Sequence, residues 1–245
     1  ELLGSATTSD AYKCVDISRE ETDQDAHVCL KIFKRGKFDQ SLDEVRILQY
    51  INSNCVDPDE KNVLRLVDFF YAEDRMCIVT ELLRVNIYEL GDAIYNAGDI
   101  PYFVYPRMKR IAKQILQALE YIHSLGLIHC DVKPENIVIK SYSKCIVKLI
   151  DFGGSLFNTS RYSSYIQSRS YRAPEVIVGC PYDGRIDIWS LGTVIAEMHT
   201  NSVLFSNTSV PTMLARIIDV LGPFPENVID RGTNTRDLFT PGPDR

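Results

Sequence analysis

The sequence lacks any long apolar run. None approaches the roughly 20 consecutive apolar residues that a membrane-spanning helix requires. The first residues, Glu1-Leu2-Leu3-Gly4, contain neither the basic region nor the apolar core of a secretory signal. We therefore expect no association with a membrane.

Other absences exclude further classes of protein. The net charge is −6, and residues of both signs are mixed along the chain, so we expect no broad basic surface for nucleic acid. The seven cysteines include no Cys-x-x-Cys pair. This indicates free thiols in a reducing compartment rather than a zinc site or a disulfide framework.

What is present fits a soluble globular protein, with 45% apolar and 24% charged residues. In the first part of the chain, the apolar runs 26–33 and 76–83 predict strands. Between them, apolar residues spaced three or four apart over 38–51 predict a helix, and the polar segment 52–61 predicts a loop.

The later part of the chain has mainly helical periodicity. The predicted elements are an amphipathic helix over 108–122 that ends near Gly126, a short strand over 145–150, a helix over 186–198 that is apolar on nearly every face, and an amphipathic helix over 211–221 that stops at Gly222. We therefore expect an α+β fold, in which a small strand-rich part joins a larger helix-rich part near residues 82–86.

Two motifs carry the chemistry: the loop His129-Cys130-Asp131-Val132-Lys133-Pro134-Glu135-Asn136, and Asp151-Phe152-Gly153. Asp131 can orient and deprotonate a hydroxyl, and Lys133 can neutralise a moving phosphoryl group. Asn136 and Asp151 offer hard oxygen ligands suited to Mg²⁺. The alternative is a solvated loop and an ordinary turn, but the two motifs in this order, with a short strand between them, favour phosphoryl transfer.

Together with Ala173-Pro174-Glu175 and the segment 187–192, these motifs resemble the eukaryotic protein kinase signature over essentially the whole chain. The resemblance implies a bilobal kinase fold, ATP and Mg²⁺ as cofactors, and protein substrates. It divides residues 1–245 into an N-lobe (1–82), a hinge (83–86) and an incomplete C-lobe (87–245). It also implies that Lys31 contacts the ATP phosphates and pairs with Glu44.

Further details resemble the DYRK family of the CMGC group, in its plant and protist type. The carriers are YIQSRSYRAPE at 165–175, FDQSLDE at 38–44, KSYSKC at 140–145, and Cys130 where most kinases have arginine. The resemblance implies that Tyr165 is autophosphorylated and that Arg169 and Arg172 hold its phosphate. The alternative is that Tyr165 is simply a packed aromatic residue.

The segment that would cover ATP departs from the family pattern, because only its first glycine, Gly4, is present. Small residues elsewhere in it still allow the backbone to approach phosphate, so we expect weakened rather than abolished binding, with Asp10 mildly unfavourable. The resemblance gives a nucleotide site made of Gly4, Ala6, Ala11, Cys29, Lys31, Glu81, Leu83 and Val138. It also gives Thr80 at the back of the pocket, where a bulkier residue is usual, and so predicts a roomier rear cavity.

His129 could be taken for a catalytic base, but a structural role is the better interpretation. With Phe152, Leu48 and Leu66, it resembles the hydrophobic spine of a kinase. We expect it to pack rather than to transfer protons.

We predict an active serine/threonine kinase that autophosphorylates a tyrosine, with possible preferences for proline after the target and arginine before it. A pseudokinase acting as a scaffold or allosteric partner is the alternative, supported only by the depleted glycine segment. The motif Ala-Pro-Glu disfavours a small-molecule kinase. Glu175 lacks the downstream arginine that pairs with it in the family, so we expect a partial domain. We further expect a monomer in the cytoplasm, the nucleus or both.

Overall fold

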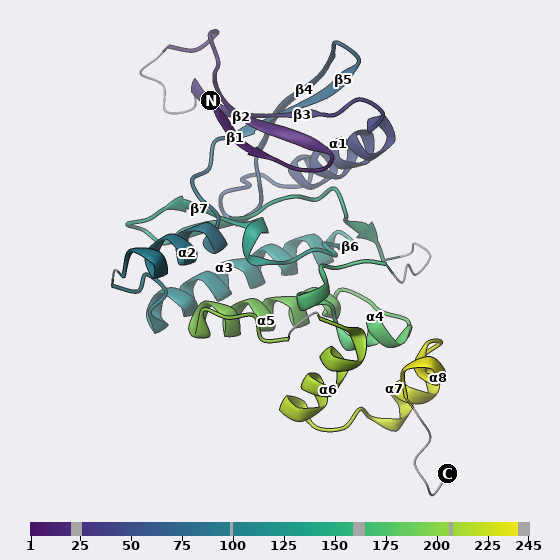
Figure 1. Cartoon of the computed structure of the whole chain (residues 1–245). Coiled ribbons are helices and arrows are strands. Elements are labelled where there is room, and N and C mark those ends of the chain that lie inside the picture. The colour runs from purple at the N-terminus through teal and green to yellow at the C-terminus, as the bar shows by residue number, and fades with distance from the viewer. Residues whose placement is uncertain (21–25, 99, 159–164, 206–207, 240–245) are drawn as a thin grey trace, which may run out of the picture.

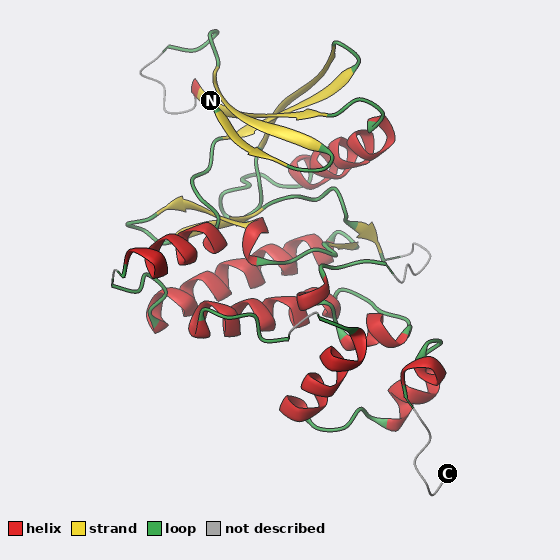
Figure 2. Ribbon diagram, viewed as in Figure 1, coloured by secondary structure: helices red, strands yellow, loops and turns green. Residues whose placement is uncertain are grey.

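The computed structural model describes residues 1–20, 26–98, 100–158, 165–205 and 208–239. A small sheet with one helix against it lies above a larger, mainly helical part (Figures 1 and 2). The expected α+β division into two parts is therefore confirmed. Within the described ranges, no helix is both long enough and apolar enough to cross a membrane.

The small part is a five-stranded antiparallel sheet in the order β1-β2-β3-β5-β4. Its elements are β1 (Leu2–Ser5), β2 (Ser9–Val15), β3 (His27–Phe33), α1 (Phe38–Ser53), β4 (Leu66–Ala72) and β5 (Arg75–Glu81). The predicted apolar stripe of α1 is buried at Val45, Leu48 and Ile51. It packs beside β5 and so holds the helix against the sheet.

The large part contains the remaining elements. They are α2 (Ile87–Ala97), α3 (Tyr105–Ser124), β6 (Leu127–Ile128), β7 (Ile137–Ser141), β8 (Ile146–Leu149), β9 (Leu156–Phe157), α4 (Pro174–Val178), α5 (Arg185–Thr200), α6 (Val210–Leu221), α7 (Glu226–Arg231) and α8 (Thr235–Leu238), with short 3-10 turns at Pro134–Asn136 and Arg169–Tyr171. The antiparallel strand pairs β6–β9 and β7–β8 lie at the upper side of this part, facing the small sheet (Figure 1).

Helix ends follow ordinary capping chemistry. Asn86 accepts a hydrogen bond from the backbone N–H of Glu89 at the start of α2, and Gly98 ends that helix in the left-handed conformation. Gly126 follows α3 with φ +77°, as its predicted role at that helix end requires.

Helix α5 occupies the centre of the large part. Leu191 and Val194 belong to the main core, Ile186 to a second cluster that includes Ala173 and Val176, and Trp189 packs against a third cluster around α6. The prediction that protein surrounds this helix holds for most of its length. Ile188, which is 43% exposed, and Gly192 are exceptions. On α6, Val220 and Leu221 are also exposed.

Candidate active site

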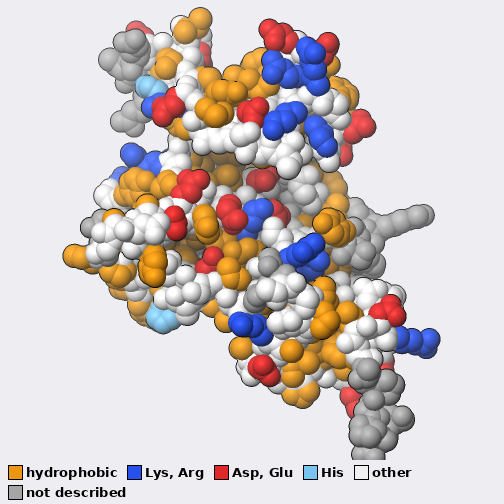
Figure 3. Space-filling model, in the orientation of Figure 1, with side chains coloured by type: hydrophobic (Ala, Val, Ile, Leu, Met, Phe, Trp, Pro, Cys, Tyr) orange, Lys and Arg blue, Asp and Glu red, His pale blue; other side chains and the backbone are white. Residues whose placement is uncertain are grey.

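A cleft of about 770 Å³ separates the two parts of the molecule. Figure 3 shows it as a hollow with charged side chains inside. Both parts contribute to its lining. The lining includes every residue predicted to contact the nucleotide, namely Gly4, Ala6, Ala11, Cys29, Lys31, Glu81, Leu83 and Val138.

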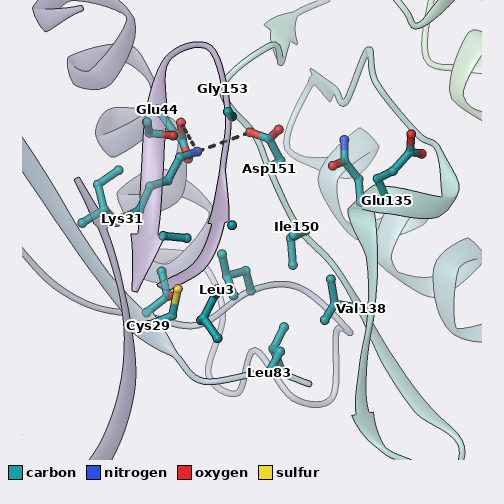
Figure 4. Close-up of a pocket in the computed structure, with 18 of the residues that line it drawn as sticks. Leu3, Cys29, Lys31, Glu44, Leu83, Glu135, Val138, Ile150, Asp151 and Gly153 are labelled. Carbon is teal, nitrogen blue, oxygen red and sulfur yellow. Dashed lines mark hydrogen bonds and ion pairs between the residues drawn. The ribbon is translucent and has the colours of Figure 1, made fainter. Parts of the chain in front are cut away.

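Lys31 and Glu44 meet inside this cleft. Lys31 Nζ lies 2.6 Å from Glu44 Oε1 and 2.9 Å from Oε2, and 3.5 Å from Asp151 Oδ1 (Figure 4). Burial alone would lower the pKa of Lys31, but the two carboxylates outweigh it and raise that pKa. The lysine is therefore held as a cation inside the cleft, where it can meet phosphate oxygens.

Gly153 allows this arrangement because it has no side chain. A Cβ atom at this position would lie 2.9 Å from Glu44 Oε2, closer than real Cβ contacts come. Asp151 itself has φ +62°, and its carboxylate points toward Lys31 (Figure 4). The glycine thus lets the Asp151 turn pass directly beside the ion pair.

The loop around Asp131 brings its predicted functional groups together. Lys133 Nζ lies 2.7 Å from Asp131 Oδ2. The side-chain amide of Asn136 donates to the backbone carbonyl of Asp131 at 2.8 Å. Burial alone would lower the pKa of Lys133, but the hydrogen bond that Lys133 donates to Asp131 and the charge of Asp131 outweigh it and raise that pKa. A carboxylate, a lysine cation and an amide therefore face one small volume.

Ser168 is a member of this group that the sequence reasoning missed. Its hydroxyl donates to Asp131 Oδ1 at 2.7 Å, and its backbone N–H donates to the same atom at 3.1 Å. Lys133 Nζ lies 3.4 Å from the Ser168 hydroxyl. Ser168 lies 37 residues after Asp131, so no local spacing could have revealed the contact.

The donor set fits a magnesium ion. Asp151 keeps its pKa below the ordinary value, because Lys31, His129 and Lys133 outweigh the effect of burial. Asn136 uses its amide nitrogen within the loop, and no hydrogen bond within the described part of the chain reaches its Oδ1. Two oxygen ligands suit Mg²⁺, which usually keeps several waters and takes further oxygens from phosphates.

The protein kinase domain family matches residues 1–232 of the chain. The chain belongs to the protein kinase family. It is 40% identical over 241 residues to the probable serine/threonine-protein kinase dyrk2 of Dictyostelium discoideum, covering 97% of this chain and 25% of that protein. It is 36% identical to the dual specificity tyrosine-phosphorylation-regulated kinase 4 of Homo sapiens (98% and 44%) and 38% identical to the DYRK-family kinase pom1 of Schizosaccharomyces pombe (98% and 21%).

These relatives are kinases of the DYRK type, as the activation-segment motif predicted. The chain spans less than half the length of each of them. The kinase fold explains why a five-stranded sheet and a helical part enclose the cleft between them.

In this kinase domain, His129 is structural, as expected. It is fully buried, its ring lies 5.2 Å from that of Phe152, and its Nε2 lies 3.0 Å from the carbonyl oxygen of Ile150. Leu48 is buried and Leu66 half-buried in the main core, which also contains Phe152. His129 and Phe152 are therefore in contact, and Leu48 and Leu66 belong to the core that includes Phe152.

The catalytic loop is anchored from below by helix α5 of the kinase domain. The fully buried Asp187 accepts hydrogen bonds from the backbone N–H groups of His129 at 2.8 Å and Cys130 at 3.0 Å. Its Oδ2 also lies 2.8 Å from His123 Nε2. Cys130 has φ +66°, and burial raises the pKa of its thiol. The chain thus has a buried neutral thiol where most kinases carry an arginine.

The side chain of Tyr165 is 81% exposed, so it is not buried in the core of the domain. The Arg172 guanidinium lies 5.6 Å from its ring centroid and also donates to the carbonyl oxygens of Ile166 and Gln167. Arg169 is exposed nearby. Ser163 and Ser164 lie outside the described residues.

The segment 4–11, which covers the kinase cleft, lacks the later glycines of the family pattern and is held in place by polar contacts. Ser5 donates to Asp10 Oδ1 at 2.5 Å. Lys34 Nζ lies 3.7 Å from the same oxygen and donates to the carbonyl of Ala6 at 2.5 Å. Asp10 therefore has a cation and a hydroxyl beside it, which offsets the unfavourable charge expected from the sequence.

Glu175 lies where the kinase motif Ala-Pro-Glu places it. Burial raises its pKa, and no Lys or Arg side chain forms an ion pair with it among the described residues. Thr80 is buried at the back of the cleft, next to Cys29 across the β3–β5 pairing.

Proposed function

We propose that this chain is the catalytic domain of an ATP-dependent serine/threonine kinase of the DYRK type, which also phosphorylates its own Tyr165. The observation that carries the proposal is the Lys31–Glu44 ion pair, closed at 2.6 Å, with Asp151 beside it. A closed pair is what phosphoryl transfer requires of a kinase. A degraded pseudokinase site has no need to retain it.

The lining of the cleft supports an order of groups along bound ATP. Cys29 and Val138 would hold the adenine from either face, and the backbone of Glu81 and Leu83 would bind its edge. Lys31 would bind the phosphates. Asn136 and Asp151 would hold Mg²⁺, which screens the phosphate charge when bound.

The groups at Asp131 support transfer to a hydroxyl. Asp131 would orient the substrate hydroxyl and take its proton as the new oxygen–phosphorus bond forms. The bond between the γ-phosphorus and its bridging oxygen then breaks, and ADP leaves. Lys133 would neutralise charge on the phosphoryl group in transit. The Ser168 hydroxyl, 2.7 Å from Asp131 Oδ1, illustrates how this carboxylate receives a hydroxyl.

Two features support the expected substrate preferences. Arg172 donates hydrogen bonds to the carbonyl oxygens of Ile166 and Gln167. These two oxygens are therefore poor acceptors for an N–H group of the substrate. A proline has no N–H and therefore loses no hydrogen bond at this position.

Glu135 lines the cleft, and burial raises the pKa of Glu197, with the charge of Glu135 adding to the effect. A substrate arginine would relieve this repulsion.

Tyr165 supports the autophosphorylation proposal because it is exposed and close to a cation. A phosphate on its hydroxyl could turn toward Arg169, while Arg172 stays beneath the ring. The alternative of an inactive scaffold rests on the missing glycines. The contacts of Lys34 and Ser5 give the covering segment a defined shape without them.

The test is phosphate incorporation from labelled ATP with Mg²⁺, followed by mass-spectrometric mapping of sites. Wild-type chain should label a protein substrate on Ser or Thr and itself on Tyr165, and Asp131→Asn should lower both by at least about a hundredfold. Tyr165→Phe should remove the tyrosine label only. Absence of label in the wild type, or equal label in the Asp131→Asn variant, would contradict the proposal.

A further inference from the structure

Four charged side chains gather behind the hinge. They are Asp59 from the loop after α1, Glu81 at the end of β5, Lys140 on β7 and Lys148 on β8. Lys148 Nζ contacts a carboxylate oxygen of both Asp59 and Glu81. Lys140 Nζ lies 2.5 Å from Asp59 Oδ2 and 3.3 Å from Glu81 Oε2.

The burial of this group is uneven. The side chain of Lys148 is 0% exposed and that of Glu81 is 5% exposed, whereas that of Asp59 is 46% exposed. A buried lysine is costly unless carboxylates surround it. Although burial raises the pKa of Asp59, hydrogen bonds from Lys140 and Lys148 outweigh it and leave that pKa below its ordinary value. Asp59 therefore stays charged at neutral pH, and both lysines contact Asp59 and Glu81.

Glu81 links this group to the nucleotide. Its carboxylate lies among the lysines, and its Oε1 also accepts the backbone N–H of Arg65 at 2.8 Å. Its own N–H donates to the Arg65 carbonyl at 3.1 Å. Because Glu81 also lines the cleft, its side-chain contacts set the position of the hinge backbone that would meet adenine.

The loop that carries Asp59 is itself fixed to the large part of the molecule. The N–H of Leu149 donates to the Asn62 carbonyl at 2.8 Å, and the N–H of Leu64 donates to the Leu149 carbonyl at 3.2 Å. Asp59 is thus a fixed anion next to β8 rather than a freely moving surface charge. It can hold both lysines in place against Glu81.

We propose that Asp59 is a positioning residue for nucleotide binding. Together with Lys140 and Lys148, it fixes the position of the Glu81 carboxylate and so places the hinge backbone where it can form hydrogen bonds with adenine. This inference rests on the proposed ATP-dependent function. Asp59 acts through the hinge and does not touch the nucleotide. A small shift of the hinge weakens binding because the hydrogen bonds to the adenine edge depend on distance and direction.

The experiment compares Asp59→Ala, Asp59→Glu and Glu60→Ala with wild type, using the whole chain. Glu60 is the matched control, since it is the adjacent, exposed acidic residue of the same loop and forms no ion pair with either lysine. Mg-ATP binding, KM and kcat are measured, together with amide hydrogen exchange over residues 81–84. Asp59→Ala leaves the buried Lys148 paired with Glu81, so the fold should survive.

In Asp59→Ala, KM for ATP should rise about threefold to tenfold with kcat within about twofold of wild type, and hinge amides should exchange faster. Asp59→Glu should restore KM to within about twofold of wild type, and Glu60→Ala should change nothing. Unchanged hinge exchange in Asp59→Ala, or an unchanged KM in an active enzyme, would overturn the inference. Faster hinge exchange in a chain that transfers no phosphate would overturn the proposed function alone.

Discussion

The substitution Gly153→Ala adds a single methyl group and should damage the Lys31–Glu44 ion pair although neither of these two residues is changed. The new Cβ would lie 2.9 Å from Glu44 Oε2, and ordinary contact begins near 3.4 Å, so the carboxylate must move by about 0.5 Å. Gly153 does not have a left-handed φ, so alanine can adopt its backbone conformation. The effect is therefore steric and directed at one oxygen.

The magnitude follows from the bonds at risk. Glu44 Oε2 accepts from Lys31 at 2.9 Å, and moving it weakens one of the two charge-assisted hydrogen bonds of the pair. Such a bond contributes about 1.5–3 kcal/mol when fully formed. Since the Lys31 side chain is 23% exposed, a partial loss of about 1–2 kcal/mol is reasonable. This corresponds to a roughly 5- to 30-fold fall in kcat/KM.

The assay is steady-state phosphorylation of a peptide substrate, with Gly154→Ala as the matched control. Gly154 is the next residue, and a Cβ there meets nothing within 4 Å. Gly154→Ala should keep kcat/KM within about twofold of wild type. If both variants lose the same activity, or neither loses any, the steric argument is wrong.

Two further outcomes are expected. Thr80→Phe should fill the rear of the cleft and abolish strong inhibition by bulky hinge-binding compounds; equal inhibition of both forms would contradict the roomier rear cavity. Burial raises the pKa of the Cys29 thiol above its ordinary value of 9.0, so the reactive thiolate is scarce at neutral pH and its alkylation should accelerate only as pH rises past 9. Alkylation of Cys29 at pH 7.5 as fast as that of a peptide thiol would refute this. Mg-ATP should slow the alkylation of Cys29 at high pH, because this residue lines the cleft.

The residues that face the cleft could be predicted because they belong to short motifs whose members are close in sequence. Asp131, Lys133 and Asn136 lie within six residues and meet in the structure. The helices α1, α3 and α6 were predicted from apolar periodicity, and α5 from a stretch that is apolar on nearly every face.

What could not be predicted depends on long-range contacts or on exposed apolar residues. Strand β4 runs Leu66–Ala72 along the edge of the sheet, and most of its residues are exposed, so it shows no alternation of buried and exposed positions. Ser168 and Asp59 meet their partners only after segments distant in sequence fold together. Asp59 in particular lies in a segment that the sequence marks only as a polar loop.

The contacts of Asp187 have a consequence for the order in which the site can form. The two backbone N–H groups that it binds belong to residues 58 and 57 positions earlier in the chain. During synthesis, the segment carrying Asp131 therefore emerges well before the anchor that holds it. The catalytic loop cannot take its final shape until α5 has left the ribosome and docked, so a nascent chain that ends before residue 185 should contain Lys31, Asp131 and Asp151 and still be unable to transfer phosphate.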